Sequence, residues 1–236
     1  MIDCKNYVIT HKECDVQEDN MYRILCVGDY RKEGLLTERS GDNISAYNAR
    51  INECTGLYWI WKNTSSEYVG MCHYRRWFYN CRYVHDKSRL DADRVEELLK
   101  DHDIILANKV TFAWTVGNNC SIELGQDINE VANYEFFDLI RERQPDYLDD
   151  YCDVMDGHSM YVYNMFVTRR EILNDYCEWL FSFLLDAADR LDIVGLSQKQ
   201  QRIAGYYAEM MWTVWMHHQN LKVCEQPCRM LPGGAK

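Results

Sequence analysis

Short apolar runs separated by polar turns mark the β-strands that this sequence predicts. Tyr7-Val8-Ile9-Thr10 is the first of them, and Tyr22–Val27, closed by Gly28-Asp29, is the second. Brief apolar runs with polar or glycine boundaries are typical of strands that are buried on both faces of a sheet. We expect strands at residues 7–10, 22–27, 67–72, 102–107, 160–167 and 221–224.

Between these runs, apolar residues recur at steps of three and four, which predicts helices. In the segment 42–63, Ile44, Tyr47, Ile51 and Cys54 follow this spacing. Asp42 or Asn43 is expected to cap that helix, and Asn63 to end it. Further helices are expected at residues 90–100, 134–143, 171–191 and 202–217. Residues 111–134 show no clear period, and we expect them to form the flexible or acceptor-facing part of the molecule.

The alternation of strands and helices predicts an α/β fold with a mostly parallel sheet flanked by helices. A strand, a long helix and a strand follow one another between residues 22 and 72, and such a crossover favours parallel pairing. The 236 residues are 47% apolar, enough to bury a sizeable core without disulfides. We therefore expect a single domain over residues 1–236.

The charge and cysteine content exclude several classes of protein. The chain has 26 Lys and Arg against 37 Asp and Glu, so its net charge is −11, which argues against a nucleic-acid-binding surface. Its 11 cysteines include no Cys-x-x-Cys pair, which favours reduced thiols in the cytoplasm. Glu178 and Asp186 interrupt the longest apolar stretch, so no membrane span is expected.

The strongest chemical signal follows the strand predicted at residues 67–72. His73, Arg75 and Arg76 stand directly after it, and Arg82 is nearby. Ligands of open parallel sheets bind at the carboxyl ends of the strands, so three arginines and a histidine in an acidic protein indicate a site for an anionic group such as a diphosphate. The alternative is that these arginines are simply paired with the excess of surface carboxylates.

Two other polar segments are candidates for binding the same ligand. Thr10-His11-Lys12 stands at the end of the first strand, although ordinary loop polarity explains it equally well. Asp42, Asn43 and Ser45 begin a predicted helix, where capping accounts for their types, and amides at a helix start also suit a phosphate or a sugar hydroxyl.

The second half of the chain offers candidates for catalysis and for sugar or acceptor binding. Asn164 lies in an apolar run, where it is either a hydrogen-bonded core residue or a sugar contact. Arg202 and Glu209 share one face of a predicted helix, so they form either a structural ion pair or part of a site. Asp156 and His158 flank a glycine turn, and with Glu209 they are the candidate catalytic bases.

From about Tyr7 to Pro227 the chain resembles a bacterial family of capsular and exopolysaccharide glycosyltransferases, long described as a domain of unknown function. The agreement runs in order through most of the chain. The matching segments are Thr10-His11-Lys12, 41–45, 55–63, 67–70, His73-Tyr74-Arg75-Arg76, 163–166, 176–181 and 202–209.

This resemblance implies a GT-A type fold with a Rossmann-like sheet and transfer of a hexose from a UDP-sugar. Galactose, in its pyranose or furanose form, is the expected sugar, and a lipid-linked or growing polysaccharide is the expected acceptor. Residues 1–110 would form the nucleotide-sugar half and residues 111–236 the acceptor half. The enzyme would be cytoplasmic, and a lipid-linked acceptor would place it at the inner face of the membrane.

The resemblance to GT-A enzymes also implies an Asp-x-Asp motif, which would hold a divalent metal on the sugar diphosphate. Asp91-Ala92-Asp93 begins a predicted helix and Asp101-His102-Asp103 precedes a strand, so neither stands where that motif is expected. Our hypothesis is that His73, Arg75 and Arg76 replace the metal, with no cofactor, and that transfer is inverting. A divalent metal such as Mn²⁺ or Mg²⁺ is the alternative. A non-catalytic sugar-nucleotide or glycan-binding module and a nucleotidyl-type enzyme are the other functions considered.

Overall fold

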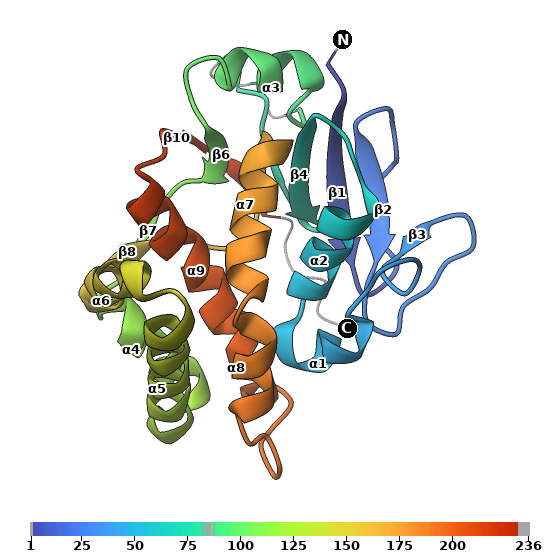
Figure 1. Ribbon diagram of the computed structural model, residues 1–236. Helices are drawn as coiled ribbons and strands as arrows, with labels where there is room; N and C mark the ends of the chain where they lie inside the picture. Colours follow the sequence, from blue (N-terminus) through green and yellow to red (C-terminus); the bar gives the residue numbers. More distant parts are fainter. Residues whose placement is uncertain (1, 82, 84–85, 87, 231–236) are drawn as a thin grey trace.

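The computed structural model of this chain describes residues 2–81, 83, 86 and 88–230. Its centre is a nine-stranded sheet with the order β10-β6-β9-β4-β1-β2-β3, in which β5 pairs with β4 and β11 pairs with β5 (Figure 1). The strands are β1 Cys4–Thr10, β2 Tyr22–Cys26, β3 Leu36–Thr37, β4 Tyr68–His73, β5 Arg76–Phe78, β6 Ile104–Ala107, β9 Phe166–Arg169, β10 Val223–Gln226 and β11 Cys228–Met230. A separate pair joins β7 Val110–Thr111 to β8 Ser159–Met160.

Strand directions confirm the predicted mostly parallel α/β sheet. Strand β1 pairs in parallel with β2 and β4, and β10 pairs in parallel with β6. Strand β9 lies antiparallel between β4 and β6, so these two strands run in the same direction. As a result, the carboxyl ends of β1, β2, β4 and β6 meet at one edge of the sheet, where a ligand site is expected.

Helices cover the sheet, and a group of them lies beside it. In Figure 1, α2 and α7 lie in front of the sheet, while α4, α5 and α6 form a helical group beside α9. The helices are α1 Asn48–Ile51, α2 Cys54–Asn63, α3 Ala92–Leu98, α4 Val116–Leu124, α5 Gln126–Arg143, α6 Leu148–Asp156, α7 Arg170–Phe181, α8 Leu184–Arg190 and α9 Ile203–Gln219, with 3-10 turns at Ser45–Tyr47, Pro145–Tyr147 and Gln200–Arg202. In the described part of the chain, none of them combines the length and apolar character needed to cross a bilayer.

Two hydrophobic cores, one on each face of the sheet, fix its position. Strand β4 sends Val69 and Met71 into the larger core and Cys72 into the smaller one, as the alternation of a strand dictates. At Gly70 a Cβ atom would lie 2.9 Å from the carbonyl oxygen of Phe166, so only glycine allows β9 to pair this closely. The sheet that carries the site is therefore packed on both faces.

The predicted continuous helix over residues 42–63 is wrong. A 3-10 turn begins after Ile44 without a side-chain cap, and the helix breaks at Asn52, whose φ is 52°. Asn43 instead accepts hydrogen bonds from the backbone N–H and the hydroxyl of Ser45. Asn63 does end α2, as expected.

The predicted strand over residues 160–167 is also wrong, because the chain turns in its middle. Tyr163 and Asn164 have φ values of 83° and 47°, and the strand that joins the sheet is β9, at residues 166–169. Residues 111–134, which lack a clear period, contain α4 and the first half of α5.

Candidate active site

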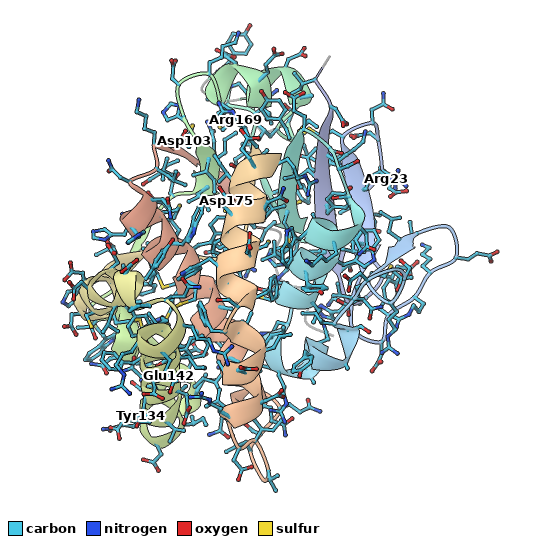
Figure 2. The ribbon with its side chains drawn as sticks, viewed as in Figure 1. Arg23, Asp103, Tyr134, Glu142, Arg169 and Asp175 are labelled. Carbon is cyan, nitrogen blue, oxygen red and sulfur yellow. The ribbon has the colours of Figure 1, made fainter. Side chains whose placement is uncertain are left out.

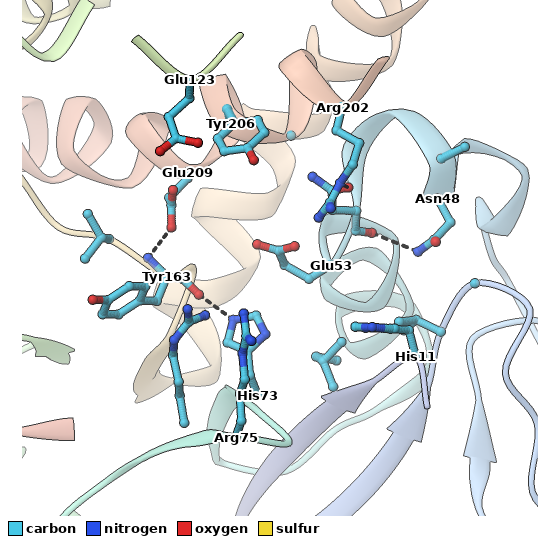
Figure 3. Close-up of a pocket in the computed structure, with 18 of the residues that line it drawn as sticks. His11, Asn48, Glu53, His73, Arg75, Glu123, Tyr163, Arg202, Tyr206 and Glu209 are labelled. Carbon is cyan, nitrogen blue, oxygen red and sulfur yellow. Dashed lines mark hydrogen bonds between the residues drawn. The ribbon is translucent and has the colours of Figure 1, made fainter. Parts of the chain in front are cut away.

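A pocket of about 950 Å³ opens where the carboxyl ends of β1 and β4 meet the helices (Figure 3). Strand ends contribute His11, His73 and the residues that follow it, and the junction of α1 and α2 contributes Asn52 and Glu53. The opposite wall comes from α4 and from α9, which supplies Gly205, Tyr206 and Glu209. The pocket thus joins residues from both halves of the chain.

One side of the pocket is cationic and centres on the ring of Tyr74. His11 meets this ring edge-on at 5.5 Å between centroids, and the cations of Lys12 and Arg75 lie 5.4 and 5.9 Å from its centroid. Partial desolvation, and then the positive charges of Lys12, Arg202 and Arg75, lower the pKa of His11. An anion entering here would relieve that mutual repulsion.

The arginines after β4 turn toward this pocket. Arg76 places its guanidinium 4.4 Å from the centroid of the Tyr163 ring. Arg75 lines the pocket and forms no ion pair with any residue that the structure describes, so the alternative that it is paired with a surface carboxylate is wrong. Arg82 lies outside the described residues.

Two carboxylates, Glu53 and Glu209, stand on the other side. The Oε1 atom of Glu209 accepts a hydrogen bond from the backbone N–H of Tyr163, and Oε1 of Glu53 accepts one of 2.9 Å from the amide of Asn164. Burial, and next the charge of Glu53, raise the pKa of Glu209 to about 7. A carboxyl group with that pKa can accept a proton at neutral pH.

His73 joins the two sides. Its Nε2 lies 2.5 Å from the carbonyl oxygen of Tyr163, and because a carbonyl only accepts, Nε2 carries the hydrogen. Burial is the main cause that lowers the pKa of His73, against the raising effect of Glu53. The neutral imidazole therefore acts as a hydrogen-bond donor that fixes the turn at Tyr163.

Several predicted site residues do not line the pocket. The Thr10 hydroxyl donates to the carbonyl of Lys12 at 2.5 Å and closes the turn after β1. Lys12 is exposed, and its ammonium lies 5.4 Å from the centroid of the Tyr74 ring. Asp42 bonds Tyr58 and Asn63, toward the far end of α2. The residues predicted to bind the donor that are absent from the pocket lining are Thr10, Lys12, Asp42, Asn43 and Ser45, while His11, His73, Arg75 and Arg76 are present.

Of the three candidate bases, the structure places only Glu209 in the pocket. Asp156 ends α6 and His158 follows it, and both are exposed and absent from the pocket lining. Arg202 lines the pocket but donates to Asn52, so the ion pair between Arg202 and Glu209 considered from the sequence does not form.

Asn164 lies just behind the wall rather than on it. It is 3% exposed, and its amide also approaches the Cys54 sulfur at 3.9 Å. Glu53, which Asn164 holds, was not singled out from the sequence. In the sequence, Glu53 is marked only by the polar pair Asn52-Glu53 between Ile51 and Cys54. The spacing of those two apolar residues is that of a continuous helix, so the pair looks like part of its solvent-exposed face.

The residues at the end of β4 do not fit a divalent metal. An imidazole that carries hydrogen on Nε2 and two guanidiniums occupy the place where Asp-x-Asp acids are expected, and guanidinium repels a cation. Asp91 caps α3, and Asp103 accepts from the backbone of Lys222 at the opposite edge of the sheet. Within the described residues, no three His, Cys, Asp or Glu side chains group together as metal ligands would.

One solved structure has a similar fold over nearly the whole of this chain. A solved structure of the apo form of the WbbM bifunctional glycosyltransferase matches with a TM-score of 0.82 and 23% identity. The match covers 98% of this chain and 46% of that one, so this chain spans about half of its length. The mannosyltransferase Ktr4p from S. cerevisiae matches with a TM-score of only 0.35 and 10% identity, over 89% of this chain and 62% of that one. None of the curated proteins matches the chain.

The model of one protein family matches residues 5–220, which include every strand end and every helix that lines the pocket. The matched range is more than half of the chain. The chain therefore belongs to the family described as Domain of unknown function (DUF4422).

Proposed function

We propose that this protein is a glycosyltransferase that transfers a hexose from a UDP-sugar to a lipid-linked or growing polysaccharide, with inversion and without a metal. The observation that carries the proposal is the division of charge in one pocket. His11, Arg75 and Arg202 gather where a diphosphate would be released, and Glu209 stands beside them. The similarity in fold to a bifunctional glycosyltransferase supports the reaction class.

In the proposed reaction, the acceptor hydroxyl oxygen attacks the anomeric carbon while the bond from that carbon to the diphosphate oxygen breaks. Arg75, Arg76 and Arg202 stabilise the negative charge that develops on the departing nucleoside diphosphate. Glu209 takes the acceptor proton on Oε2, which has no hydrogen-bond partner among the described residues. A base whose pKa is about 7 suits this role near neutral pH.

The two halves of the chain divide these tasks in our proposal. Residues 1–110 supply His11, His73 and the arginines after β4, and residues 111–236 supply Glu209 toward the acceptor and Arg202 toward the diphosphate. Galactose remains the sugar that the family resemblance favours. Asp156 and His158 remain the alternative bases, to be compared with Glu209 by substitution.

Incubation of the purified protein with UDP-, GDP- and CMP-sugars and an oligosaccharide or polyprenyl-phosphate-sugar acceptor tests the proposal. Transfer from one UDP-sugar, with the opposite anomeric configuration in the product by proton NMR, is expected. Binding without turnover would instead indicate a sugar-nucleotide-binding module. Release of pyrophosphate from UTP and a sugar 1-phosphate would indicate a nucleotidyl-type enzyme.

The absence of a metal requirement in this proposal has its own test. Activity should persist in excess EDTA, because fixed guanidinium charge, rather than an ion, faces the diphosphate. Loss of turnover in EDTA that is restored by Mn²⁺ or Mg²⁺ would refute this part of the proposal. It would leave the transferase assignment intact.

A further inference from the structure

Glu53 is a carboxylate of the pocket that the proposed reaction does not use. It stands at the start of α2, directly after Asn52, whose φ is positive, and points into the pocket in Figure 3. Its Oε1 accepts the hydrogen bond from Asn164, whereas Oε2 has no partner among the residues described. It also forms no ion pair with a described residue. One oxygen of Glu53 is thus fixed and the other is available to a ligand.

The turn at Tyr163 and Asn164 is built to hold this arrangement. Tyr163 and Asn164 are two consecutive residues other than glycine with positive φ, and such conformations persist where the surroundings require them. The turn makes three hydrogen bonds into the site: Tyr163 N–H to Glu209, His73 Nε2–H to the Tyr163 carbonyl, and the Asn164 amide to Glu53. It therefore positions both carboxylates with the imidazole.

The chemistry of a carboxylate selects what Glu53 can contact. An ionised carboxylate only accepts hydrogen bonds, and so do the oxygens of an ionised diphosphate. Glu53 would repel the diphosphate, which belongs with the cations around Tyr74. A sugar ring offers several hydroxyl donors and no charge. In a pocket that takes a sugar nucleotide, the sugar is the part that matches Glu53.

Resting on the proposed function, we infer that Glu53 binds hydroxyl groups of the transferred sugar, and that Asn164 is the positioning residue that aims it. Glu53 then fixes the orientation of the sugar relative to Glu209, while the cationic side holds the nucleotide. Selectivity for the sugar resides in this acidic side of the pocket. A carboxylate that receives hydroxyl hydrogens discriminates strongly against sugars that lack them, because its oxygen would be left without a donor.

Calorimetric titration of UDP and of the UDP-hexose that wild-type protein binds most tightly tests this inference. Glu53→Gln should weaken UDP-hexose binding about 10-fold and leave UDP binding no weaker, since the nucleotide does not touch Glu53. Glu96→Gln removes the same charge from exposed α3 and should change neither affinity. Equal weakening of UDP and UDP-hexose, or unchanged UDP-hexose binding, would overturn the inference. Failure of wild-type protein to bind any sugar nucleotide would instead refute the proposed function.

The positioning role of Asn164 calls for a measurement that general destabilisation would not reproduce. Asn164→Gly keeps a residue that tolerates positive φ and removes the amide, so it should cause part of the loss seen in Glu53→Gln. In the Glu53→Gln background the same change should have little further effect on UDP-hexose binding. Additive effects of the two substitutions would show that Asn164 does not act through Glu53.

Discussion

The two sides of the pocket carry opposite charge, and they are also built differently. The cationic side comes from loops at the ends of β1 and β4, where Arg75 has no carboxylate partner among the described residues. On the acidic side, Glu53 and Glu209 come from helices, and each is held by a hydrogen bond from one turn. On the cationic side, the Arg75 guanidinium is available to the oxygens of a ligand, whereas hydrogen bonds already hold both carboxylates in position.

The arginines of the pocket also differ from arginines elsewhere on the molecular surface. Elsewhere, several arginines are paired with carboxylates: Arg23 bonds Glu18, and Arg89 bonds Asp19. The stick view in Figure 2 shows Arg23 at the edge of the sheet and Arg169 near Asp103. Such exposed pairs contribute little to stability. In a protein with a net charge of −11, arginines that stay away from these carboxylates are the ones to test for function.

The largest effect is expected on the acidic side. Glu209→Gln preserves the acceptor for the Tyr163 N–H but cannot take a proton, so kcat should fall about 10²–10⁴-fold while the donor KM changes little. Steady-state kinetics with the active UDP-sugar measure this, with Glu96→Gln as the charge-matched control. If Asp156→Asn or His158→Gln abolishes turnover while Glu209→Gln does not, the base is misassigned.

A somewhat smaller effect, on binding rather than turnover, is expected on the cationic side. Arg75→Ala removes a guanidinium that faces the diphosphate and should weaken UDP binding by about 10–100-fold, with the loss growing smaller as salt is raised. Arg141→Ala, which removes an arginine paired with Asp138 on α5, should leave binding unchanged. Equal UDP affinity for Arg75→Ala and wild type would show that the unpaired guanidinium is not a ligand for phosphate.

The sequence predicts the cationic side of the pocket better than the acidic side, because the two sides are formed by different kinds of local structure. That His11 and His73 lie at one edge of the sheet was predictable, because the apolar runs 7–9 and 68–72 mark parallel strands whose carboxyl ends meet there. Glu53 was missed because Asn52 takes a positive φ of 52°, which breaks the helix without disturbing the apolar spacing of Ile51 and Cys54. Tyr163 and Asn164 likewise turn the chain inside an apolar run that carries no glycine or proline as a signal.

The packing that joins the two sides can be tested at Gly205. A Cβ on this residue of α9 would lie 2.2 Å from the Asn52 amide nitrogen, so Gly205→Ala should lower the free energy of unfolding by about 1–3 kcal/mol and separate Asn52 from Arg202. Denaturant titration measures this loss. The double variant Asn52→Gly/Gly205→Ala, which lacks the Asn52 amide and keeps only a 3.2 Å approach to the Ile51 carbonyl carbon, should regain part of the stability. No recovery would place the strain elsewhere.

The smallest expected effect concerns stability and pH. Because the pKa of Glu209 is raised from 4.5 to about 7, the folded state holds more protons than the unfolded state between these values. Stability attributable to this group is therefore complete below pH 4.5 and declines as pH rises through 7. The lowered pKa of His73 acts in the opposite direction and costs stability as pH falls below 6.5. Wild type and a Glu209→Gln variant both retain His73, so this effect cancels when the two are compared.

Glu209→Gln should consequently be more stable than wild type by about 1–3 kcal/mol at pH 8.5 and equal to it at pH 4.5. Thermal unfolding of the two proteins across this range measures the difference. A gap that does not change with pH would mean that Glu209 ionises freely in the folded protein, and that the acidic side of the pocket is as open to water as the cationic side.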